Sequence, residues 1–244
     1  MKKINILRPT IFPFDIINSG ITLANYQLGE KGFSAYKTDA FTEDEIINNT
    51  NILADNIGVS VQNLIFQKQI HTTNIQIIDK SEHPILESDG LITNKNGLVL
   101  CINLADCGGV LCYDAKNNAI GTFHSGWKGT QLNIVAVGIN KMKKVYSTNS
   151  ADLLVYLTPC AGKEHYEVEY DVAQHFYNHI EQVNNGKYLL DIKGVIVKQL
   201  LDIGVRKENI EISSICTISN KMYHSFRREE NKSGRMTAFI SIKN

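Results

Sequence analysis

Between residues 97 and 124 the chain has three apolar runs, each the length of one β-strand and separated by only a few residues. The first run, GLVLCINL, is almost continuously apolar, which predicts a strand that is covered on both faces. The next two, VLCYD and AIGTFH, flank the turn-favouring stretch AKNN, so they can pair as a hairpin. A turn centred on Asn117 would place Val110 opposite His124.

This hairpin brings two reactive side chains to one end of the sheet. Cys107 lies on the turn ADCGG just before the hairpin, and His124 lies at its far end. His71, in QKQIHTTN between two predicted strands, can add a second imidazole. Zinc binds thiolate and imidazole readily, and three protein ligands with an open fourth position are typical of a catalytic zinc site. The alternative is a packed thiol and two histidines with backbone partners.

The remaining pattern mixes helices and strands. Helices are predicted over residues 42–59, 130–146 and 170–183, the first of them with Thr42 as its cap and Glu45 completing a capping box. Strands are predicted over residues 63–70 and 74–79, on either side of His71. Because the elements do not alternate strictly, the class is α/β or α+β with a mixed sheet. No linker, repeat or low-complexity tract interrupts the chain, so residues 1–244 are treated as one domain.

Composition excludes several classes of partner. The 25 basic and 25 acidic residues balance, so no overall field favours nucleic acid or an anionic membrane. No window approaches the roughly 18 apolar residues of a membrane span. The N-terminal segment lacks the unbroken apolar region of a signal peptide. Five cysteines, an odd number, indicate a reduced, cytoplasmic setting instead of a disulfide framework. The oligomeric state stays open.

The segments QIH, DGLIT, NLADC, HSGWKG, YEV and FRREENKSGR occur in the order found in the polyphenol oxidase or laccase-domain family. Members of this family are also described as multifunctional purine nucleoside phosphorylases. The resemblance runs from about residue 60 to the end, and departs from the family pattern in ADCGG, which lacks the usual proline, and at Ser125 and Lys128.

The resemblance implies a mixed-sheet α/β/β/α layered sandwich with zinc held by His71, Cys107 and His124. It also implies phosphorolysis, or deamination, of purine nucleosides such as adenosine, inosine, guanosine or methylthioadenosine, with phosphate as the second small-molecule substrate. Asp106, beside Cys107, could assist proton transfer or orient a ligand. The alternative for Asp106 is a turn carboxylate that caps backbone amides.

Further candidates come from two basic segments. HSGWKGT leads into a predicted helix, where Lys128 could bind phosphate and Trp127 could stack on a purine. FRREENKSGR contributes three forked guanidiniums suited to phosphate, those of Arg227, Arg228 and Arg235. A solvated basic stretch is the alternative.

The other thiols and imidazoles have no ligand-like spacing. Cys160 is predicted to be a packed thiol. The remaining histidines are predicted to lie on the surface or on helix faces, namely His83, His165, His175, His179 and His224.

Three rival functions remain. A laccase-like copper oxidoreductase is disfavoured because seven histidines include no His-x-His pair. A metal-free hydrolase would use Cys107 as nucleophile, His71 or His124 as base and Asp106 as orienter. A binding module, for example with a cell-wall role, would use zinc only as a structural staple and needs a fourth protein ligand, such as Cys112 or Cys160.

Overall fold

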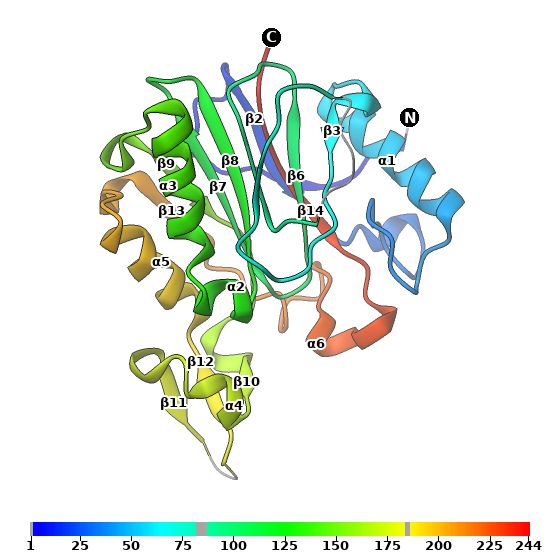
Figure 1. The fold of residues 1–244 in the computed structure, drawn as a ribbon. Helices are drawn as coiled ribbons and strands as arrows, with labels where there is room; N and C mark the ends of the chain where they lie inside the picture. Colours follow the sequence, from blue (N-terminus) through cyan, green and yellow to red (C-terminus); the bar gives the residue numbers. More distant parts are fainter. Residues whose placement is uncertain (1, 82–86, 184–185) are drawn as a thin grey trace.

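The computed structural model describes residues 2–81, 87–183 and 186–244, and within them the strands form three sheets (Figure 1). The five-stranded sheet has the order β1 (Ile6–Leu7), β2 (Ile17–Thr22), β14 (Met236–Ile242), β6 (Val99–Leu104) and β3 (Leu64–Ile65). The six-stranded sheet has the order β13 (Ile210–Ile212), β9 (Leu154–Leu157), β7 (Gly108–Asp114), β8 (Ala119–Ser125), β5 (Gly90–Thr93) and β4 (Ile75–Ile77). A small third sheet consists of β10 (Glu167–Val168), β12 (Tyr188–Leu190) and β11 (Ile180–Gln182).

The helices lie outside the two large sheets. They are α1 (Glu43–Ile57), α2 (Trp127–Gln131), α3 (Ile134–Tyr146), α4 (Tyr170–Ala173), α5 (Ile192–Asp202) and α6 (Phe226–Glu229). Helices α3 and α5 cover the six-stranded sheet, while α1 covers the outer face of the five-stranded sheet (Figure 1). Both large sheets contain parallel and antiparallel pairs. The expected α/β/β/α sandwich with mixed sheets is therefore confirmed.

Strand β7 shows why the sequence folds into these layers. Val110 and Cys112 pack against the helical layer, whereas Leu111 and Tyr113 pack into the space between the sheets. Because both faces are covered, every residue of β7 is buried. The same holds for β6, which confirms the strand predicted within GLVLCINL.

Helix α1 follows its sequence signals closely. The Thr42 hydroxyl accepts a hydrogen bond from the Glu45 amide, and the Glu45 carboxylate accepts one from the Thr42 amide. Its buried face, which includes Leu53 and Ile57, packs on the five-stranded sheet. Gly58 ends the helix in the left-handed conformation. None of the helices in the described part of the chain has the length and apolarity that crossing a membrane requires.

Two predicted helices differ from the structure. The segment 130–146 is divided between α2 and α3, because Asn133 adopts φ 56° and caps α3 with its side chain. In the segment 170–183 only Tyr170–Ala173 are α-helical, Tyr177–His179 form a short 3-10 helix, and residues 180–182 pair with β12 as strand β11. Pairing with a neighbouring strand thus outweighs a weak local helical pattern there.

Candidate metal centre

Two connections between the large sheets carry two of the predicted ligands. The connection from β3 to β4 carries His71, and the connection from β6 to β7 carries Cys107. His124 lies in β8. In the hairpin of β7 and β8, the residue opposite His124 is Gly109. The hairpin is confirmed, with a register one residue away from the expected pairing of Val110 with His124. The ligand atoms of His71, Cys107 and His124 lie within 4.8 Å of one another.

This group fits a zinc ion. Ligand atoms bound tetrahedrally at zinc–nitrogen and zinc–sulfur distances are about 3.5 Å apart, so atoms that lie within 4.8 Å of one another can close around one ion. Gly126 makes room for the group, since a Cβ there would lie 2.8 Å from the sulfur of Cys107 and 3.2 Å from the His71 ring. Among the described residues no other histidine, cysteine or carboxylate belongs to it, so a four-coordinate ion held here would have one position without a protein ligand.

Asp89 is the residue of the site that sequence reasoning missed. Its buried carboxylate contacts Nδ1 of His124 at 2.8 Å, which leaves the other ring nitrogen for a metal. It also accepts hydrogen bonds from the backbone N–H groups of Ile70, His71 and Thr72. These bonds hold His71 at φ 60°. One carboxylate therefore positions both histidines, and the DGLIT segment was its only signal in the sequence.

Electrostatics favour the metal-binding form of the thiol. Burial alone would raise the pKa of Cys107, but the charge of His124 and hydrogen bonds with His124 and His71 lower it. Burial alone would lower the pKa of His124, but the Cys107 charge and the hydrogen bond with Asp89 raise it. Thiolate is the form of cysteine that binds metals.

Gln69 connects the His71 loop to the strand that leads to Cys107. Its side-chain amide donates to the carbonyl of Asn103 (2.9 Å) and accepts from the Asn103 N–H (2.7 Å), as a neighbouring strand would. The glutamine of QIH thus fixes the spacing between two ligand-bearing connections.

Asp106 anchors the C-terminal segment to the site. Its carboxylate accepts hydrogen bonds from the hydroxyls of Thr217 (2.6 Å) and Ser225 (2.9 Å) and from the backbone N–H of Arg227 (2.7 Å). The bond from the Arg227 N–H matches one of the two alternatives given for Asp106, a turn carboxylate that caps backbone amides. The other alternative was a role in proton transfer. The bonds to Asp106 bring FRREENKSGR, far away in sequence, to the metal centre.

Two hollows meet at the metal centre, and His71, Cys107 and Phe226 line both of them. The larger has a volume of about 560 Å³ and is lined by Trp127, Tyr166 and Arg227 together with several carboxylates. The smaller has a volume of about 270 Å³ and is lined by Tyr36, Asn103 and Arg235. Each predicted ligand therefore faces space that a small molecule can enter.

The predicted phosphate-binding cations have different surroundings. Arg228 donates all five of its N–H groups, to three backbone carbonyls and to the Glu229 carboxylate, so it has none left for phosphate. Arg227 lies over the Tyr166 ring at 5.6 Å. The Lys128 ammonium lies 5.4 Å from the Trp127 ring and lines neither hollow.

The remaining thiols and imidazoles lie outside the group. Cys160 is buried, and its bridge partner in a parallel pairing is Cys216. His165 and His175 are exposed and His179 is half-buried, whereas His83 lies outside the described residues. The position expected for His224, on the surface or on a helix face, is wrong. Its ring is fully buried, with Nε2 2.9 Å from the Phe33 carbonyl oxygen, because the C-terminal segment folds back over it.

The contacts of Glu229 lead us to expect that the protein loses stability in acid. Burial alone would raise the pKa of Glu229, but contacts with His224, Arg228 and Tyr26 lower it to about 2. A pKa below the unfolded-state value means that the stabilisation is complete above about pH 4.5 and is lost as the pH falls toward 2. Urea unfolding of the wild type and Glu229→Gln should show a stability difference at pH 6 that shrinks by pH 3. A difference that is the same at both pH values would contradict this.

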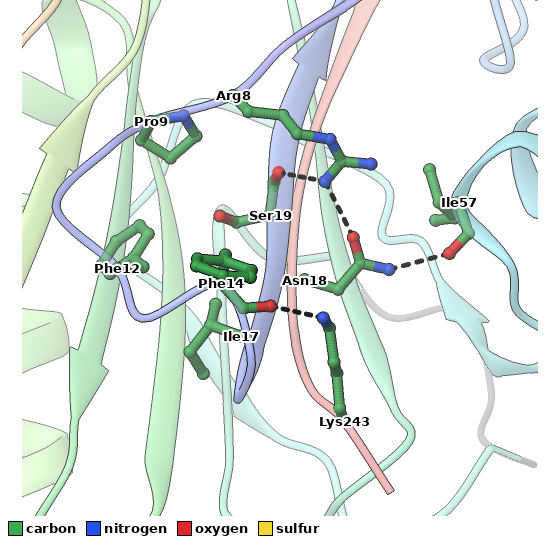
Figure 2. Close-up of a pocket in the computed structure, with 9 residues that line it drawn as sticks. All are labelled: Arg8, Pro9, Phe12, Phe14, Ile17, Asn18, Ser19, Ile57 and Lys243. Atoms are coloured by element: carbon green, nitrogen blue, oxygen red, sulfur yellow. Dashed lines mark hydrogen bonds between the residues drawn. The ribbon is translucent and has the colours of Figure 1, made fainter.

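A third hollow, of about 380 Å³, lies away from the metal centre beside β2 and the end of β14 (Figure 2). The Arg8 guanidinium donates there to the Asn18 side chain and the Ser19 carbonyl, and the Lys243 ammonium donates to the Phe14 carbonyl. None of the predicted site residues lines it.

The fold and the site together define a class, a layered α/β protein with an open His–Cys–His centre where its two large sheets are connected. The family model described as multi-copper polyphenol oxidoreductase laccase matches residues 20–243, and the chain belongs to this family. The match includes N-terminal residues before about residue 60, where the sequence motifs match the family poorly.

Relatives and solved structures agree with this assignment. The chain is 26% identical to purine nucleoside phosphorylase YlmD of Bacillus subtilis, over 92% of this chain and 88% of that protein. It is 36% identical to a purine nucleoside phosphorylase of Clostridium acetobutylicum, over 75% of this chain and 79% of that protein. The crystal structure of Bacillus licheniformis hypothetical protein YfiH has a TM-score of 0.86 and 28% identity, covering 93% of both chains.

Proposed function

We propose that this protein is a zinc-dependent purine nucleoside phosphorylase acting on adenosine, inosine, guanosine or methylthioadenosine. The observation that carries the proposal is the three-ligand group, open on the side where two hollows meet. The names of relatives that span most of this chain support phosphorolysis of purine nucleosides. Deamination of adenosine is proposed as a second activity of the same site.

In phosphorolysis an oxygen of hydrogen phosphate attacks the anomeric carbon of the ribose. The bond from that carbon to the purine nitrogen breaks, its electron pair leaves with the base, and the proton of hydrogen phosphate ends on the base. Trp127 and Tyr166 present aromatic side chains to the larger hollow, where a purine can stack. His71, Cys107 and His124 would hold zinc, which when bound supplies positive charge as a Lewis acid.

The remaining side chains hold this arrangement in place. Asp89 orients both histidines, and Asp106 holds the backbone of Arg227 against the larger hollow. Preorganised groups of this kind lower the barrier because they need not rearrange during the reaction. We propose this positioning role for Asp106 alongside proton transfer.

The test is turnover by zinc-loaded protein. Adenosine with phosphate should yield adenine and ribose 1-phosphate, and removal of the metal by a chelator should abolish the products until zinc is restored. Inosine formed from adenosine without phosphate would report deamination. Absence of turnover with adenosine, inosine, guanosine and methylthioadenosine would refute the proposed function.

Experiments on the same zinc-loaded protein also distinguish the phosphorylase from the three alternative functions. The contacts of Cys107 with His124 and of His124 with Asp89 also suit a metal-free thiol hydrolase, with Asp89 in place of Asp106 as orienter. Zinc would inhibit such an enzyme, whereas it should activate the phosphorylase. Stoichiometric copper in elemental analysis would favour the oxidoreductase. A structural zinc site with four protein ligands gains no support among the described residues, because neither Cys112 nor Cys160 belongs to the ligand group.

A further inference from the structure

We propose that the smaller hollow is the phosphate subsite, with Arg235 and Asn103 as its donors, and that the larger hollow receives the nucleoside. The inference rests on the proposed phosphorylase function and divides its two substrates between the two sides of the metal centre. The contrast in charge between the hollows is the first observation. The larger hollow is lined by five carboxylates, those of Asp106, Glu167, Glu169, Asp171 and Glu230.

These carboxylates make the larger hollow less favourable for a phosphate dianion than a hollow lined by a cation, since like charges repel. They can instead accept hydrogen bonds from ribose hydroxyls and from an exocyclic amino group of a purine. Lys187, one of its two cations, is paired with Glu167 at 3.4 Å. No carboxylate of the described residues lines the smaller hollow, and Arg235 supplies a guanidinium to it.

Arg235 is held so that one edge of its guanidinium remains available. One terminal nitrogen, Nη1, donates to the carbonyls of Ser233 (3.0 Å) and Gly234 (2.9 Å). The guanidinium lies 5.7 Å from the Phe226 ring, which restricts its motion further. Within the described residues Nε and Nη2 have no partner, and this pair of parallel donors matches two oxygens of a phosphate.

Asn103 provides the second, independent observation. The residue is only 4% exposed, and its Oδ1 accepts a hydrogen bond from the Thr237 hydroxyl at 2.9 Å. Its Nδ2 is buried and has no hydrogen-bond partner in the part of the chain that the structure describes. An unpaired buried donor is costly, so its position on a hollow beside a guanidinium indicates an acceptor that arrives with a ligand.

The arrangement suits the direction of the reaction. In a direct displacement the phosphate oxygen approaches the anomeric carbon from the face opposite to the departing base. The two hollows meet at His71, Cys107 and Phe226, so a ribose placed there has phosphate on one side and the purine on the other. Reactants held in this orientation lose little further entropy on reacting.

The decisive experiment compares Arg235→Gln with Arg227→Gln, because each removes one guanidinium, the first from the smaller hollow and the second from the larger. In zinc-loaded Arg235→Gln the KM for phosphate should rise by about 10- to 100-fold while the KM for adenosine stays within about twofold. In Arg227→Gln the KM for phosphate should stay near the wild-type value. The reverse pattern, or equal effects, would overturn the assignment.

Calorimetric titration with inorganic phosphate tests the subsite without turnover. Wild-type zinc-loaded protein should bind phosphate, and Arg235→Gln and Asn103→Asp should each lose at least about tenfold in affinity. Asn103→Asp keeps the size of the side chain but places a negative charge in the hollow. Undiminished binding in both variants, or no binding to the wild type, would refute the subsite. Phosphate binding by a wild type that turns over no nucleoside would instead refute the phosphorylase.

Discussion

Cys107→Ser is expected to yield a folded protein that retains no zinc after dialysis and loses about a thousandfold or more in kcat/KM for nucleoside phosphorolysis. A serine hydroxyl stays protonated near neutral pH and is a poor zinc ligand, so only His71 and His124 would remain. Folding should persist because the turn is held by other contacts, including the three bonds to Asp106. Metal analysis, circular dichroism and steady-state kinetics measure the three quantities.

Cys216→Ser is the matched control, since this thiol is also half-buried but belongs to no ligand group among the described residues. A serine there can still accept the hydrogen bond that the Gly162 N–H donates to the sulfur at 3.1 Å. Zinc content and activity should stay at the wild-type level. If Cys107→Ser kept stoichiometric zinc and full activity, the ligand assignment would be wrong.

Asp89→Asn is expected to weaken zinc binding by about 10- to 100-fold and to lower the free energy of unfolding by about 3 kcal/mol. The amide of asparagine brings an NH₂ group to a position surrounded by donors, among them the N–H groups of Ile70 and Thr72. The negative charge that raises the pKa of His124 is lost as well. Both histidines would then be held less firmly in the ligand geometry.

The control for this variant is Asp114→Asn, which changes another buried carboxylate that accepts bonds from backbone N–H groups. Asp114 accepts from the N–H groups of Lys116 and Asn117 at the hairpin turn, at the far end of β7 from Cys107. Asp114→Asn should lower stability without changing zinc affinity. Equal zinc affinity in Asp89→Asn and the wild type would show that Asp89 stabilises the fold only. Competition with a chromophoric chelator measures the affinity, and urea unfolding measures the stability.

Local sequence patterns determined much of the fold. The capping box of α1 is formed by Thr42 and Glu45, the two residues that signal it, because both partners lie within one turn. The buried strand β6 and the hairpin of β7 and β8 follow from apolar run length and a turn between them. Residues 170–183 show the limit, since the pairing of β11 with β12 involves residues that the helical pattern does not include.

The metal centre could be predicted from the sequence only in part. Cys107 and His124 lie around one hairpin, so strand geometry alone brings them near each other. His71 was predicted as a ligand because it lies between two predicted strands. In the structure those strands are shorter than expected and belong to different sheets. The resemblance of the motifs to a known family, and not spacing alone, joined the three.

The sequence by itself determined the chemical types at the site and the strands that lie around them, because periodicity and turn signals depend on neighbouring residues. Only the tertiary structure decided which carboxylate bonds to the histidine at the site, and which arginine keeps N–H groups without a partner among the described residues. Asp89 contacts His124 across 35 positions, and Asp106 contacts Arg227 across 121. Arg228 and Arg235 are the same residue type in the same segment. Backbone carbonyls and Glu229 accept from every N–H of the Arg228 guanidinium, whereas the Arg235 guanidinium donates only to two backbone carbonyls, through Nη1. Partners of this kind are set by how distant segments pack, which no local pattern records.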